Sequence, residues 1–77
     1  MSLPDLTAEG HAIAARECIA IAEHFERVAE IHDGELAPYL ARQHRADALA
    51  VRARAAKHLD LAIAKTVQDS ITRLSVF

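Results

Sequence analysis

The feature that most constrains the fold is a single internal break in a chain that otherwise lacks helix breakers. The only glycines are Gly10 and Gly34, and the only prolines are Pro4 and Pro38. Gly34 suits the left-handed position that ends a helix, and Pro38 is tolerated in the first turn of the next one. β-Branched residues are scattered singly, so no strand is predicted. The pattern predicts an all-α helical hairpin with its turn at about residues 33–36.

The two predicted helices differ in length. The first should run from about residue 8 to about residue 32, with Ser2 or Thr7 as its N-cap. The second meets no breaker and should run from about residue 37 to about residue 74, roughly 55 Å at 1.5 Å per residue. A kink near residues 57–60 that folds the tail back is the alternative. In both cases residues 1–77 make one helical-hairpin domain.

Apolar residues form one face on the first predicted helix and two on the second. The first helix groups Ile13, Ala14, Ile21, Phe25, Val28 and Ile31. The second helix groups Leu36, Leu40 and Val51 on one side, and Leu49, Ala53, Ala56, Ile63, Val67, Ile71 and Leu74 on the opposite side. A helix with two apolar faces needs two neighbours. We expect the first helix to cover one face and a second copy of the chain to cover the other, through Leu49, Ile63, Val67, Ile71 and Leu74.

Size and composition also favour assembly. In a chain of 77 residues a single core supplies only about 3–5 kcal/mol, and the lone Cys18 excludes an intrachain disulfide. The hydrophobic residues are largely alanines, which bury little area each. We therefore predict dimerisation into a four-helix bundle, or a larger homo-oligomer, that acts as an interaction or assembly module. Another helical protein is the alternative partner.

Charge is divided between the two halves of the chain. Residues 1–35 hold eight acidic and two basic side chains, a net of −6, whereas residues 36–77 hold seven basic and three acidic ones, a net of +4. An acidic and a basic helix are most simply explained as neighbours, so a nucleic-acid partner is not expected. No signal peptide and no membrane span are predicted, and a cytoplasmic location is expected.

Polar residues on the apolar faces are the candidates for a functional site. In a closed hairpin, residues lie at one level when their numbers sum to about 68. His24 is then level with His44, Asp47 lies one turn away, and Glu17 comes within reach of Arg54. The favoured interpretation is a structural network in which Glu17 and Arg54 form a partly buried ion pair. The alternative is a metal site of His24, His44, Asp47 and Glu17, because imidazoles and carboxylates suit zinc, iron or manganese.

The same level rule pairs His11 with His58 at the end of the hairpin away from the turn. We expect two solvated histidines there, with a pH-sensitive contact as the alternative. Cys18 borders the apolar face and is interpreted as a packing residue. The few hydroxyl groups lie mainly near the termini, far from the layer of His24 and His44, so no catalytic arrangement is predicted. No cofactor is expected unless the polar cluster binds zinc, iron or manganese.

Overall fold

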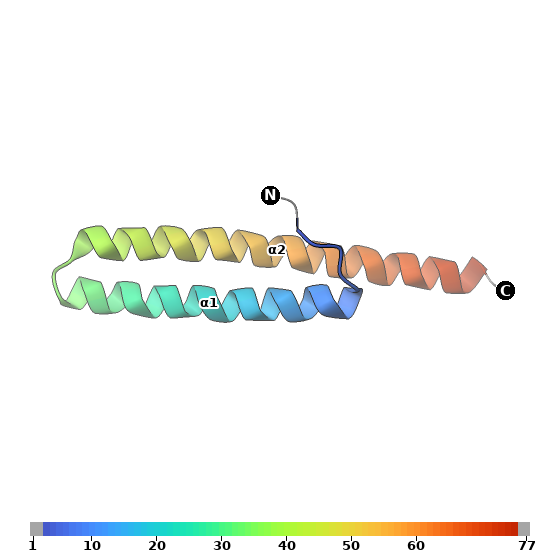
Figure 1. Ribbon diagram of the computed structural model, residues 1–77, viewed down its shortest axis with the longest axis horizontal. Helices are drawn as coiled ribbons and strands as arrows, with labels where there is room; N and C mark the ends of the chain where they lie inside the picture. Colours follow the sequence, from blue (N-terminus) through green and yellow to red (C-terminus); the bar gives the residue numbers. More distant parts are fainter. Residues whose placement is uncertain (1–2, 76–77) are drawn as a thin grey trace.

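The computed structural model describes residues 3–75, which form two antiparallel helices joined by a short turn (Figure 1). Helix α1 spans Ala8–Gly34 and helix α2 spans Pro38–Ser75. Residues 3–75 contain no strand. The all-α hairpin with a short first helix and a long second one is confirmed, and each helix ends within two residues of its predicted limits. Helix α2 is continuous, so the alternative kink near residues 57–60 is wrong.

Helix α1 begins with a side-chain cap. Thr7 has extended backbone angles, and its Oγ1 accepts a hydrogen bond of 3.0 Å from the N–H of Gly10. This satisfies one of the free N–H groups at a helix start and confirms Thr7 as the N-cap. A Cβ on Gly10 would lie 3.2 Å from Leu6 Cβ and 3.2 Å from Thr7 Oγ1. The glycine therefore allows residues 3–7, the N-terminal segment, to lie against the first turn of α1.

The turn ends α1 with two reverse hydrogen bonds. Ala37 N–H donates to the carbonyl of His32 at 2.7 Å, and Leu36 N–H donates to the carbonyl of Asp33 at 3.1 Å. This pattern is a Schellman motif, which needs one left-handed residue. Leu36 takes that conformation, with φ of 58°. The prediction that Gly34 is the left-handed residue is wrong. Gly34 is the last residue of α1, and the left-handed residue of the motif is Leu36, two positions later.

The two helices pack along a seam of small residues. Ala15, Ala22 and Ala29 of α1 and Ala41, Ala48 and Ala55 of α2 recur every seven residues and are at most 3% exposed. Between them, buried or half-buried, lie His11, Cys18, Phe25 and His32 of α1 and His44, Val51 and His58 of α2. Alternating steps of three and four residues are typical of a coiled-coil seam. Alanine allows the two helix axes to approach closely, because interaxial distance depends on the side chains at the contact.

The bulky residues of α1 lie mostly outside this seam. Phe25 packs between the helices, but Ile13, Ile21 and Ile31 are 44%, 48% and 57% exposed. The prediction that the whole isoleucine face of the first helix meets the second helix is therefore wrong. The alanine rows allow a close contact that larger side chains would hold apart.

The molecule is long and one helix thick. Its principal extents are 63 × 20 × 12 Å and its radius of gyration is 17.2 Å, where a compact domain of this length has about 11 Å. Helix α2 continues well beyond the start of α1, and the N-terminal segment crosses α2 before that overhang (Figure 1). The hairpin thus has a single interhelical seam and wide exposed sides.

Candidate functional site

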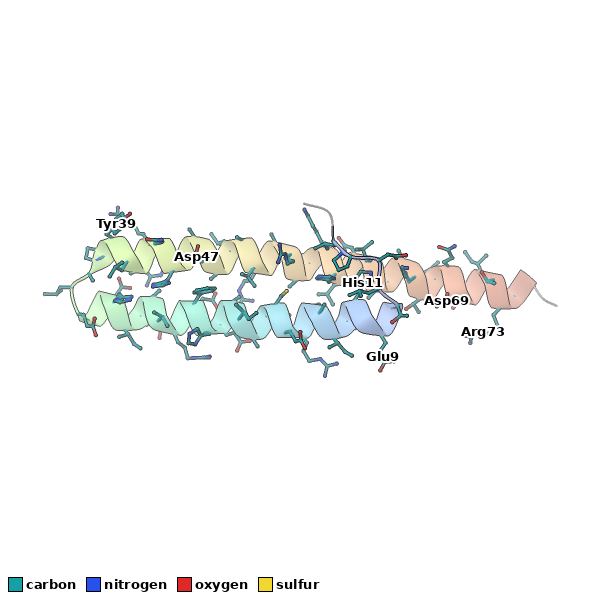
Figure 2. The ribbon with its side chains drawn as sticks, in the orientation of Figure 1. Glu9, His11, Tyr39, Asp47, Asp69 and Arg73 are labelled. Carbon is teal, nitrogen blue, oxygen red and sulfur yellow. The ribbon has the colours of Figure 1, made fainter. Side chains whose placement is uncertain are left out.

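A buried histidine pair closes the hairpin at the end away from the turn. His11 and His58 are 1% and 4% exposed, and their Nδ1 atoms lie 2.8 Å apart. Figure 2 shows His11 in the part of α1 nearest the N-terminal segment. The prediction that His11 and His58 lie opposite each other is confirmed, but the prediction that both are solvated is wrong. Both occupy seam positions of the three-and-four repeat, which places them between the helices rather than at its edge.

The hydrogen-bond partners of the pair determine its tautomers. The N–H of Leu6 lies 3.3 Å from Nε2 of His11, and a backbone N–H can only donate. Nε2 of His11 is therefore the acceptor, and the ring proton of neutral His11 is on Nδ1. That proton is donated to Nδ1 of His58, whose own proton must be on Nε2. A relay of two hydrogen bonds thus joins the backbone of the N-terminal segment to α2 through two neutral rings.

Charge and burial favour the neutral form of His11. Burial lowers the pKa of His11 below its ordinary 6.5, and the nearby His58 and Lys65 lower it further, whereas Asp5 opposes them. Lys65 also forms an ion pair with Asp5, and the hydrogen bond from Lys65 lowers the pKa of that carboxyl group. The N-terminal segment therefore has a second tie to α2, beside the histidine pair.

Three stacked rings fill the seam near the turn. His44 lies between Phe25 and His32, with ring centroids 5.9 Å and 5.2 Å away and interplanar angles of 20° and 6°. Nδ1 of His32 and Nδ1 of His44 are buried and have no hydrogen-bond partner within the described part of the chain. His32 Nδ1 lies 3.6 Å from a carboxylate oxygen of Glu35. This layer is held mainly by ring contact.

The four predicted metal ligands occupy different parts of the hairpin. His44 is in the ring stack and Asp47 is half-buried, whereas Glu17 and His24 are exposed. Within residues 3–75, no three His, Cys, Asp or Glu side chains are grouped closely enough to hold one metal ion. The structure does not bring the four together, because Phe25, one residue further along α1, occupies the seam position level with His44. Metal binding stays a prediction, which elemental analysis of purified protein measures.

The observed ion pairs differ from the predicted one. Glu17 and Arg54 are both exposed, so their predicted burial is wrong. Arg52 instead donates through Nε and Nη2 to the two carboxylate oxygens of Glu26, at 3.1 and 2.7 Å, and Arg45 donates to Asp33. These hydrogen bonds lower the pKa of Glu26 and of Asp33. The acidic helix and the basic helix are therefore neighbours, and their charges meet along one exposed flank of the seam.

The second apolar face of α2 lies on one flank of the hairpin, where Ile63 and Val67 line a shallow hollow together with Ala12 of α1. We define the outer stripe as Leu49, Ala53, Ala56, Ile63, Val67 and Leu74, which repeat at three- and four-residue steps or multiples of them. At 100° per residue its centre lies about 120° from the seam. Leu49, Ile63, Val67 and Leu74 are 52–74% exposed, and the two alanines are also exposed. Ile71, at the border of the stripe, is 58% exposed. As an interface, this face stays a prediction.

The seam residues that the sequence analysis missed follow a visible repeat. The alanine rows recur every seven residues, and the three-and-four pattern continued from them reaches His11, four residues before Ala15, and His58, three residues after Ala55. The role of the Leu6 backbone had no sequence signal, because it depends on how the N-terminal segment crosses the hairpin. No described helix is both long and apolar enough to cross a membrane. Comparison with protein-family models, curated proteins and solved structures finds no match to this chain.

Proposed function

We propose that this protein is a self-assembling helical module whose outer stripe on α2 packs against the same stripe of a second copy. The observation that carries the proposal is the exposure of four large side chains, Leu49, Ile63, Val67 and Leu74, on a flank of α2 outside the seam. A row of exposed large apolar side chains of this kind is typical of interaction sites.

The thin fold supports the proposal. A stable domain usually packs two layers of secondary structure around one core, and this hairpin has one layer. Among the residues that the structure describes, the buried apolar ones are six alanines, which bury little area each. A second hairpin on the outer stripe would add the missing layer and produce a four-helix bundle.

A second copy fits the stripe by its spacing and by its length. A partner helix with the same three-and-four repeat can pack its side chains between those of the stripe. The stripe runs along α2 both beside α1 and on the overhang beyond it. Two copies related by a twofold axis bury the same residues on each side. Asp60 occupies a stripe position between Ala56 and Ile63, and such a polar residue lowers the stability of a helix pair while favouring one register.

Light scattering at micromolar concentration tests the proposal. The wild-type chain should have the mass of a dimer or a larger oligomer. Ile63→Asp and Val67→Asp should each yield monomers, because assembly would bury an unpaired carboxylate. Gln68→Asp is the matched control, since it adds the same charge to the overhang away from the stripe and should leave the mass unchanged. A folded wild-type monomer, or unchanged mass in both stripe variants, contradicts the proposal.

Asp60→Leu provides the opposite test. Removing the polar residue from the stripe should tighten association, because the interface would then bury an apolar side chain at that level. A dilution series followed by light scattering measures the change. Unchanged or weaker association would place the interface elsewhere.

A further inference from the structure

The end of the hairpin away from the turn is held by contacts that converge on a short stretch of chain. Within the N-terminal segment, Leu6 donates its N–H to His11 and Asp5 pairs with Lys65 of α2. Leu3 borders a shallow hollow together with Lys57 and Leu61 of α2. The segment therefore lies across α2 (Figure 1), and its link to the core is the relay through His11 and His58.

Each ring nitrogen of the relay has one role in the neutral state. Nε2 of His11 accepts from Leu6, and Nδ1 of His11 donates to Nδ1 of His58. The protons of the two rings are then on Nδ1 of His11 and Nε2 of His58. A further proton from solvent can bind only to Nε2 of His11 or to Nδ1 of His58, since these two nitrogens hold the remaining lone pairs.

Both protonation sites break the relay. A proton on Nε2 of His11 would face the N–H of Leu6, and a proton on Nδ1 of His58 would face the N–H of His11 at a separation of 2.8 Å. Two donors facing each other cannot form a hydrogen bond, and the added charge would be buried. Lys65 of α2 repels this charge, and Asp5 of the N-terminal segment is the nearby group that attracts it.

We propose that the His11–His58 pair is a pH-sensitive latch, which holds the N-terminal segment on the hairpin while both rings are neutral and releases it when the pair takes up a proton. The lowered pKa of His11 agrees with a built-in preference for the neutral state. The latch lies in the seam, so it goes beyond self-assembly through the outer stripe and does not depend on it.

Nuclear magnetic resonance tests the latch in the wild-type chain. Proton–nitrogen correlations of the imidazoles should show the ring proton on Nδ1 in His11 and on Nε2 in His58 at about pH 8. As the pH is lowered stepwise below 6.5, the Leu6 amide should lose its protection from hydrogen exchange in the same step in which His11 becomes protonated. The amides of Ala22 and Ala48, in the middle of the seam, should stay protected.

Two variants sharpen the test. His11→Gln keeps an acceptor near the Nε2 position but cannot take up a proton, so the pH step at Leu6 should disappear. His24→Gln removes an exposed histidine of the same helix and should leave the step unchanged. If circular dichroism shows that His11→Gln does not fold, the wild-type spectra decide the matter. The proposal is overturned if His11 carries its proton on Nε2, if Leu6 keeps its protection while His11 titrates, or if the mid-seam amides open together with Leu6.

Discussion

The two faces of α2 share one spacing and differ in side-chain size. The seam face presents Ala41, Ala48 and Ala55 and is buried against α1, whereas the outer stripe presents Leu49, Ile63 and Val67 and is exposed. Both faces repeat at three- and four-residue steps. Small residues allow a close helix contact within the chain, and larger ones suit a helix at a wider separation. Alanine at every seventh position, as at 41, 48 and 55, therefore marks the seam face of α2, which the three-and-four periodicity alone does not distinguish.

Enlarging one alanine on each face gives the largest expected contrast. Ala48→Leu should destabilise the hairpin by about 1–3 kcal/mol, because the seam has no room for the added atoms. Ala53→Leu on the outer stripe should change the stability of the hairpin by no more than about 0.5 kcal/mol, and it should strengthen self-association by adding apolar area. Urea denaturation at low protein concentration measures the first effect, and light scattering measures the second.

The control for this pair is Ala50→Leu, at an exposed position of the same helix outside both faces. It should alter neither quantity appreciably. If Ala48→Leu and Ala50→Leu lower the free energy of unfolding equally, the alanine seam is not closely packed.

The level of each residue along the hairpin was predictable from the sequence. One turn signal and two helix lengths determine which positions lie opposite each other, and His11 does lie opposite His58. The direction in which a side chain points was harder to predict. The analysis followed the bulky residues of α1, whereas the helices pack along the alanine rows.

The predicted metal cluster required His24 to face α2, but the neighbouring residue Phe25 occupies that position. His24 and Phe25 are adjacent in sequence and differ by 100° around α1, so Phe25 stacks on His44 and His24 is exposed. A choice between bulky and small apolar faces depends on interhelical distance, which amphipathic patterning does not determine. The same uncertainty explains why Glu17 was assigned to the core and is exposed.

Lowering the pH should reduce the stability of the hairpin in two steps. The pKa of folded His11 lies below its ordinary 6.5, so the unfolded chain binds the proton first, and stability should fall as the pH drops below that value until folded His11 is also protonated. A second loss should begin near the ordinary 4.5 of Glu26 and 3.8 of Asp33 and continue to their lowered folded values. Thermal unfolding measured across this pH range checks both steps.

The variant His11→Gln separates these steps. It should abolish the upper pH step and leave the carboxylate step in place. Added salt should reduce the carboxylate step more, because those pairs are exposed and the histidine pair is buried. An upper step that persists in this variant would assign it to another histidine.

The turn determines which face of α2 meets α1, and two substitutions there should each stabilise the hairpin. Leu36→Gly relieves a left-handed leucine whose side chain is 87% exposed, and should contribute about 1 kcal/mol. Gly34→Ala fills open space at a helical position and should contribute about 0.5–1 kcal/mol. Urea midpoints measure both. A destabilised Gly34→Ala would mean that Gly34, rather than Leu36, provides the left-handed residue.

The smallest expected effect concerns the charged flank of the seam. Glu26→Gln removes the carboxylate that accepts two hydrogen bonds from Arg52, whereas Glu17→Gln changes an exposed carboxylate that was predicted to pair with Arg54. Exposed pairs contribute little, so the first variant should lower the urea midpoint by less than Ala48→Leu does, and the second should leave it nearly unchanged. Raising the ionic strength should bring the two midpoints together, since salt screens exposed charges. A larger loss with Glu17→Gln, persisting in salt, would instead restore Glu17 to a buried network with Arg54.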